Sequence, residues 1–180
     1  MGLLILAVET GFCLVVVGTS SAPAGASTPT CSAAHTFVWA STDGNGTAGT
    51  TYYVIEISNV GSSSCTLHGY ARVWAVSQAG ALVGRPATNS AASPAPSLVT
   101  LAPDATAHVM LGVVDTGALC GTHGVTSFGL RVVPPGQTLA PSPGERDEVD
   151  SFPLEVCSNE SSMHVSPVRT GTGIPLYSTS

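Results

Sequence analysis

The sequence contains no lysine, and its five arginines are outweighed by 11 acidic residues, which gives a net charge of −6. Charged residues make up 9% of the chain, against about 25% in an ordinary globular domain. A nucleic-acid-binding protein needs a basic surface that displaces counterions, so we expect no nucleic-acid partner. The absence of lysine also excludes lysine-dependent catalysis and a Walker-type phosphate loop. The low charge content argues against long solvated helices and a charge-driven disordered tail.

The first 26 residues are predicted to be a secretory signal peptide that is cleaved. Two apolar runs, 2–8 and 11–18, are followed by small residues that match an Ala-x-Ala cleavage pattern ending at Ala24 or Ala26. A retained membrane anchor is the alternative, but about 17 interrupted apolar residues are marginal for a hydrocarbon core of about 30 Å. We therefore expect a protein that is secreted or held in the cell envelope, with no membrane span after cleavage.

The cysteine count agrees with export. Cys13 leaves with the signal peptide, and an even number remains: Cys31, Cys65, Cys120 and Cys157. Four cysteines in an exported chain predict two disulfides with three possible connectivities. We favour Cys31–Cys65 and Cys120–Cys157, because each pair is nearest in sequence and brackets a region with strand signals. The alternative is metal ligation by Cys120 and His123, which lacks a second ligand pair.

The mature chain reads as roughly seven to nine short strands separated by turns. In the clearest strand, 52–58, Tyr53, Ile55 and Ile57 fall on one face, which is the two-residue period of a half-buried strand. The other predicted strands cover 35–40, 66–67, 71–76, 97–101, 105–114, 128–133, 152–156 and 163–168. This pattern predicts an all-β fold, specifically an immunoglobulin-like antiparallel β-sandwich with two disulfides, as one domain over residues 27–170.

Three segments low in hydrophobic bulk are predicted to lie at the surface. Residues 87–96 and 141–150 are expected to be loops, and 171–180 a flexible tail. Because loops on a rigid scaffold carry recognition, 87–96 together with 145–150 is the candidate binding surface.

One stretch resembles the signature of a known family. Asn59 and Gly61 are followed by Cys65-Thr66-Leu67-His68-Gly69-Tyr70 and then by a predicted strand. This run is similar to that of the secreted actinobacterial family catalogued as domain of unknown function 4232. Weaker matches are the turn Leu101–Ala105, the central Cys120 and the Val156-Cys157 step. The resemblance covers roughly Cys31 to Val168, and Asp104 stands where a glycine is more usual.

The resemblance implies an exported β-sandwich of high-GC Gram-positive bacteria, with no established activity and no catalytic residue to carry over. The motif itself has a structural interpretation. We expect Asn59 and Gly61 at turn positions with positive φ, and Leu67 in the core. Gly69 is expected to let the chain bend before Tyr70, whose ring would cover an edge of the sandwich.

A histidine–methionine pair is a candidate copper site. His108 and Met110 are two positions apart in a predicted strand, and His164 follows another methionine. Thioether and imidazole donors together suit copper, and His-x-Met spacing resembles that of some exported copper carriers with β-sandwich folds. The alternation that buries Val109 and Leu111 would place His108 and Met110 on the opposite face, where an ordinary strand-face role is the alternative.

Enzymatic chemistry has little support in the sequence. No Gly-x-Ser-x-Gly motif follows a predicted strand, and the acidic residues outside 145–150 are too scattered for paired-carboxylate catalysis. The acidic run 145–150 lacks a calcium-loop pattern and is predicted to be solvated. We therefore expect a non-enzymatic binding or structural module of the bacterial cell envelope or exterior. It would be a monomer without a cofactor whose partner is a protein or envelope component; an envelope copper-binding protein is the alternative.

Overall fold

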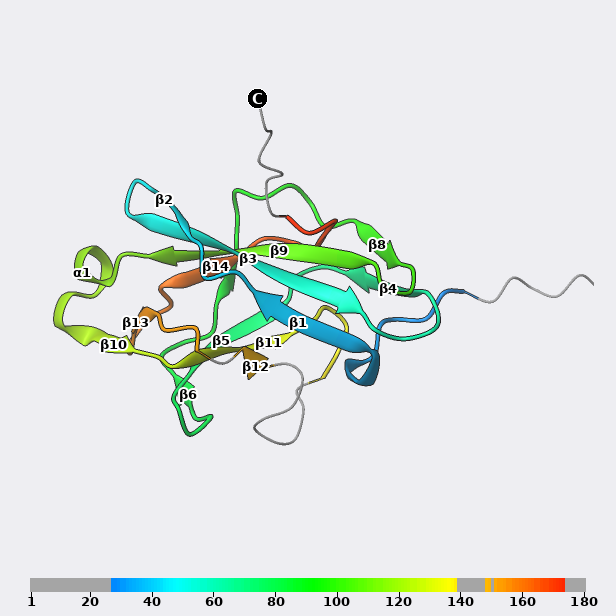
Figure 1. Ribbon diagram of the computed structural model, residues 1–180. Coiled ribbons are helices and arrows are strands. Elements are labelled where there is room, and N and C mark those ends of the chain that lie inside the picture. Colours follow the sequence, from blue (N-terminus) through cyan, green and yellow to red (C-terminus); the bar gives the residue numbers. More distant parts are fainter. Residues whose placement is uncertain (1–26, 139–147, 150, 174–180) are drawn as a thin grey trace, which may run out of the picture.

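In the computed structural model, two long antiparallel strands form the centre of the larger of two facing sheets (Figure 1). β3 (Thr50–Asn59) pairs with β9 (Thr106–Val114) from Thr50 opposite Val114 to Ser58 opposite Thr106. Around them the strand order is β1-β3-β9-β14-β7, with β2 also on β3 and β15 also on β9. The bounds are β1 (Thr36–Ala40), β2 (Asn45–Thr47), β7 (Thr88–Asn89), β14 (Met163–Val165) and β15 (Arg169–Thr170).

The second sheet faces the first across the core and has the order β12-β11-β5-β6. Its strands are β5 (Arg72–Val76), β6 (Leu82–Val83), β11 (Gly129–Val133) and β12 (Glu148–Val149). Two strand pairs lie at opposite ends of the molecule in Figure 1. They are β4 (Cys65–His68) with β8 (Leu98–Leu101), and β10 (Gly124–Thr126) with β13 (Glu155–Cys157).

Helical structure is limited to single turns among the described residues: η1 (Ala33–His35), α1 (Thr116–Leu119) and η2 (Gly121–His123). The structure describes residues 27–138, 148–149 and 151–173. The predicted signal peptide and most of the predicted tail lie outside the described residues. In the described part, no helix has the length and apolar character needed to cross a membrane.

The core lies between the two sheets, where inward side chains of both layers meet. Ile55 and Ile57 of β3 are fully buried, and Tyr53 packs against the same cluster, as the two-residue period predicted. Other buried members include Leu67, Val73, Val99, Leu101, Val109, Leu111, Leu130 and Val132. The predicted fold class, an all-β antiparallel sandwich with two disulfides, is confirmed.

Several short strands were missed, and two predicted loops each contain one. β7 lies within 87–96 and pairs in parallel with β14, while β12 lies within 141–150 and pairs with β11. Strands of two residues show no alternation in sequence and exist only through the hydrogen bonds of a partner strand. The predicted strand 163–168 is also interrupted: β14 ends at Val165, Pro167 forms an isolated bridge with Tyr70, and a ladder resumes at β15.

Both favoured disulfides are confirmed. Cys31–Cys65 joins the segment before β1 to the start of β4, and Cys120–Cys157 joins the end of α1 to the end of β13. Because the Cys120 thiol is consumed by its disulfide, the alternative of a metal site on Cys120 and His123 is wrong.

Asn59 lies in the stretch that resembles the family signature. Its buried side chain bonds to the turn after β3 and to the turn after β8. Its Nδ2 donates to the carbonyl oxygens of Ser63 at 2.9 Å and of Leu101 and Ala102 at 3.1 Å. Its Oδ1 accepts from the Gly61 N–H at 3.0 Å. The side chain is 1% exposed, so these bonds are shielded from water and replace solvation of the amide.

The prediction of positive φ at Asn59 and Gly61 is wrong. Asn59 ends β3 and makes its turn through the side-chain bond to Gly61, an Asx turn that needs no left-handed backbone. Positive φ occurs instead at Gly69, as expected for a bend there, with φ of 101°, and at Asp104, with φ of 62°. Asp104 therefore has a left-handed backbone conformation, which aspartate tolerates better than most residues.

Substitution Cys65→Ser is expected to lower the free energy of unfolding by about 3–4 kcal/mol, because it releases a loop of 34 residues in the unfolded chain. Guanidinium denaturation without reductant measures the loss. Wild-type protein that has been reduced and alkylated lacks both bridges and sets the lower limit of stability. A Cys65→Ser midpoint equal to that of the oxidised wild type would contradict the role of the bridge.

Substitution Asn59→Asp is expected to destabilise the fold by about 3 kcal/mol or more, because a carboxylate would replace the amide that donates to three carbonyl oxygens. Asn89→Asp makes the same chemical change at an exposed position and should cost less than about 0.5 kcal/mol. Urea denaturation of both variants checks the difference; equal stabilities would show that the hydrogen bonds of Asn59 contribute little.

Candidate functional site

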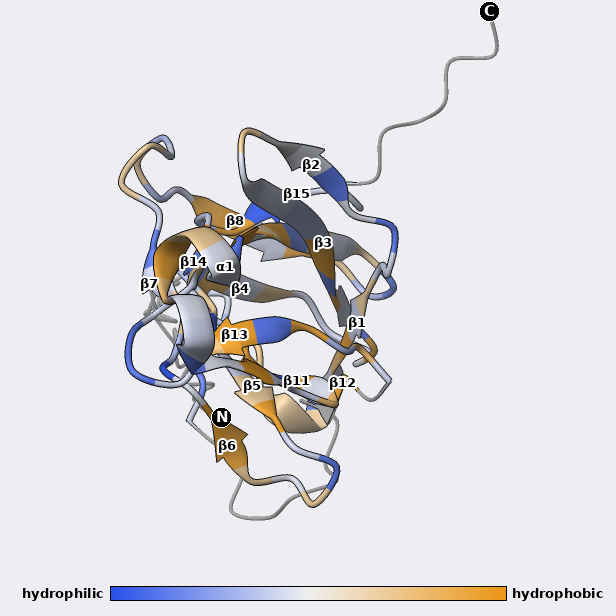
Figure 2. Cartoon of the chain, turned by 90° about the vertical axis from the view of Figure 1, so that its left-hand side faces the viewer, coloured by the Kyte–Doolittle hydropathy of each residue, from blue (hydrophilic) through white to orange (hydrophobic). Residues whose placement is uncertain are grey.

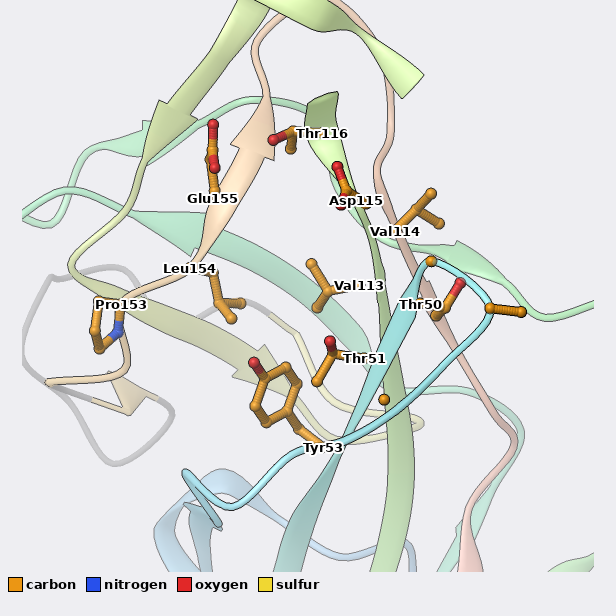
Figure 3. A pocket seen from close by; sticks show the side chains of 13 residues that line it. Thr50, Thr51, Tyr53, Val113, Val114, Asp115, Thr116, Pro153, Leu154 and Glu155 are labelled. Atoms are coloured by element: carbon orange, nitrogen blue, oxygen red, sulfur yellow. The ribbon is translucent and has the colours of Figure 1, made fainter. Parts of the chain in front are cut away.

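A groove of about 440 Å³ opens at the end of the sandwich where α1 and β13 lie (Figure 3). One wall is the tight turn between β2 and β3, where Ala48 and Gly49 have φ of 47° and 80°. The other walls are the end of β9 with Asp115 and Thr116, and the segment 153–155 that enters β13. The groove is therefore assembled from three segments that are far apart in the sequence.

Polar groups line the groove above an apolar floor. The carboxylates of Asp115 and Glu155 lie on either side of the Thr116 hydroxyl in Figure 3, while Val113 and Leu154 lie lower. Further hydroxyl groups come from Thr50, Thr51 and Tyr53. Such a surface can hydrogen-bond a polar ligand and attract a positively charged one.

Local contacts hold the groove side chains in place. Asp115 is the N-cap of α1 and uses Oδ1 to accept from the Ala118 N–H at 3.2 Å, which leaves its second oxygen for a ligand. Glu155 lies against Gly124, where any larger side chain would collide with its carboxylate. The Tyr53 ring packs edge-on against Phe152 with centroids 5.1 Å apart, so the core fixes its position.

Sequence reasoning missed this groove. Its threonines, glycines and carboxylates are ordinary strand and turn residues, and nothing in their spacing shows that the segments converge. In the sequence, Asp115 is one of several acidic residues that lie far apart along the chain. The only local indication of the groove is that Asp115 caps a helix directly after a long strand, which predicts an ordered turn at this end of the sandwich.

The predicted copper ligands lie on the outer face of the larger sheet. His108 and Met110 face outward from β9 while Val109 and Leu111 are buried, as the alternation predicted. Met110 and His164 line one shallow hollow of about 250 Å³, together with Tyr52, Ser90, Ala92, Ser93 and Ser166. The His164 ring lies over Gly112 and edge-on to Tyr52, with centroids 5.7 Å apart.

The structure separates His108 from this hollow. His164 pairs with Gly112, which is four positions from His108 along β9, or about 13 Å at the rise of an extended strand. His108 Nδ1 instead lies 2.9 Å from the Gly171 carbonyl oxygen, and Gly173 packs on its ring. Among the described side chains, no cluster of three or more His, Cys, Asp or Glu residues forms a candidate metal site.

The two segments of the predicted recognition surface lie on different sides. β7, within 87–96, is at one edge of the larger sheet, whereas β12, the described part of 145–150, lies near β1 at the opposite edge. Figure 2 shows β7 on one side of the molecule and β12 on the other. They do not form one continuous surface.

Glu56 is the acidic side chain of β3 that faces outward, between Trp39 of β1 and His108 of β9. Burial raises the pKa of Glu56 above its ordinary value, and the neighbouring His108 opposes this by lowering it. Its Oε1 is buried and has no hydrogen-bond partner among the described residues.

Comparison with known proteins identifies a family without a described activity. A sequence model of the family described as Domain of unknown function (DUF4232) matches residues 31–169. The match includes both disulfides and the groove. Neither the curated proteins nor the solved structures contain a match to the chain.

Proposed function

From the premise that this chain belongs to the family described as Domain of unknown function (DUF4232), we propose that it is an exported, non-catalytic binding module of the bacterial cell exterior or envelope. Disulfides form and persist in oxidising compartments, which supports export. The apolar N-terminal runs followed by small residues support a cleaved signal peptide.

The observation that carries the proposal is the covalent link between two walls of the groove. Asp115 and Thr116 open α1, which ends beside Cys120, and Glu155 opens β13, which ends at Cys157. The Cys120–Cys157 disulfide therefore joins the two segments that carry the groove's carboxylates. A site held rigid before binding loses less conformational entropy when the ligand enters.

The groove chemistry favours binding over catalysis. The described residues of its lining offer threonine and tyrosine hydroxyls and two carboxylates, and they include no histidine, cysteine or arginine. Nucleophilic catalysis by a hydroxyl needs an adjacent base in hydrogen-bond contact, for which the groove's hydrogen bonds give no support. The net charge of −6 and the two carboxylates favour a ligand with hydrogen-bond donors or a positive charge, such as an envelope component.

Co-sedimentation with isolated cell walls of a high-GC Gram-positive bacterium tests this function. Wild-type protein should bind, and Asp115→Asn with Glu155→Gln should weaken binding at least tenfold, or about 1.4 kcal/mol, since each carboxylate makes a charge-assisted hydrogen bond. Asparagine keeps the cap of α1, so the groove stays intact.

The matched control removes two negative charges elsewhere, with Asp43→Asn and Glu160→Gln at exposed positions. This variant should bind as the wild type does. Absence of wild-type binding, or equal weakening of both variants, would refute recognition of the envelope through the groove.

A second candidate function, copper binding, is favoured by one observation: Met110 and His164 line the same outer-face hollow. A thioether and an imidazole are ligands that suit Cu(I). Because His108 lies about 13 Å along the sheet from the position of His164, the site would consist of Met110 and His164 without it.

Equilibrium dialysis with Cu(I) under anaerobic conditions tests this alternative. One equivalent should bind to the wild type and to His108→Ala, while His164→Ala and Met110→Leu should lose it. His123→Ala changes an exposed histidine far from the hollow and should bind normally. Lack of stoichiometric binding by the wild type would eliminate the copper function.

A further inference from the structure

The outer face of the larger sheet exposes two aromatic side chains side by side on β1. Phe37 is 50% exposed and Trp39 is 43% exposed, whereas Thr36, Val38 and Ala40 between and beside them are buried. The alternation of β1 therefore turns both rings toward solvent. Two exposed aromatic side chains that are neighbours on one strand face form a small apolar patch, and such patches can mark interaction sites.

The strand register places a carboxylate directly beside the exposed indole. Trp39 is paired with Glu56 on β3, and Glu56 is paired with His108 on β9. Directly opposite residues of antiparallel strands project to the same face, with Cβ atoms about 4.5–5.5 Å apart. The Glu56 carboxyl group is therefore flanked by the Trp39 ring on one side and the His108 ring on the other.

Among the described residues, the side chains beside Glu56 direct their hydrogen-bond donors elsewhere. Its Oε1 is buried without a hydrogen-bond partner among the described residues. His108 directs Nδ1 to the carbonyl oxygen of Gly171, and Arg169, the next side chain in this row, bonds to the loop at 94–97. Glu56 as a whole is half-buried, so a ligand would reach its carboxyl group through the part of the side chain that remains exposed.

An exposed aromatic face beside a half-buried carboxyl group matches one ligand chemistry closely. A guanidinium group is planar, stacks on an indole through cation–π attraction, and donates a fork of N–H bonds to a carboxylate. The net charge of −6 attracts such a cation from a distance. A purely apolar partner would instead cover Glu56 and leave its charge unpaired, which is unfavourable.

We propose that Trp39 and Glu56 form a receptor for the guanidinium group of an arginine side chain presented by a partner protein. This surface is separate from the groove, because Tyr53 and Thr51, which line the groove, project from the opposite side of β3. The inference goes beyond the proposed function and does not depend on the ligand of the groove.

The probe is a fluorescein-labelled peptide of alternating glycine and arginine, titrated by fluorescence anisotropy. Glu56→Gln and Trp39→Thr should each weaken binding about tenfold or more, and a lysine version of the peptide should bind more weakly than the arginine version. Glu160→Gln removes an equal charge at an exposed site, and Leu98→Thr removes an apolar side chain of β8 that is more exposed than Trp39; both should change the affinity less than twofold.

NMR supplies a readout that does not depend on any variant. The protein has two tryptophans, so its spectrum contains two indole N–H resonances, and only that of Trp39 should shift with added peptide. Trp74, on β5 in the other sheet, serves as the internal control. Equal loss of affinity in Glu56→Gln and Glu160→Gln, or no shift of the Trp39 resonance, would overturn the proposal.

The double variant that alters the groove distinguishes the arginine receptor from the proposed binding of the envelope by the groove. Asp115→Asn with Glu155→Gln should bind the arginine peptide with wild-type affinity, even where it no longer binds cell walls. If the groove variant loses the peptide and Glu56→Gln retains it, the arginine receptor is refuted and the groove becomes the cation site.

Discussion

The antiparallel pairing of β3 with β9 is the constraint on which both surfaces of this protein depend. It fixes which side chains of each strand face the core and which face outward, because a slip of one residue would exchange the two faces. The inward side supplies Ile55, Ile57 and Leu111 to the core, and its end supplies Thr51 and Val113 to the groove. The outward side carries the Glu56 carboxyl group, which is paired with Trp39 of β1, and the His108 imidazole on β9.

The disulfides and the buried asparagine hold the ends of this framework. A chain with few charges and many glycines has little else with which to fix its loops, and cross-links and buried hydrogen bonds restrict the loops directly. Cys120–Cys157 links two walls of the groove, while Cys31–Cys65 and the Asn59 side chain hold the opposite end. The family signature is thus explained by folding, and the two candidate binding surfaces lie largely outside it.

Prediction from sequence succeeded where the physical cause was local. The alternation in 52–58 identified the inward face of β3, and the spacing of the cysteines with their flanking strand signals favoured the correct pairing. It failed where the cause was a distant partner. The two-residue strands β7 and β12 exist through the ladders of other strands. The Nδ2 bonds of Asn59 to the carbonyl oxygens of Leu101 and Ala102 reach 42 and 43 residues along the chain.

By itself, therefore, the sequence determined the all-β sandwich, its two disulfides and the low content of basic residues, since side-chain period and composition act along the chain. Only the tertiary structure decided which side chains share a site. It placed His164 in one hollow with Met110 and left His108 outside that hollow, set Asp115 and Glu155 around one groove, and set Trp39 beside Glu56. The physical reason is strand register: which residues become neighbours across a sheet depends on pairing between distant segments, and no local pattern encodes it.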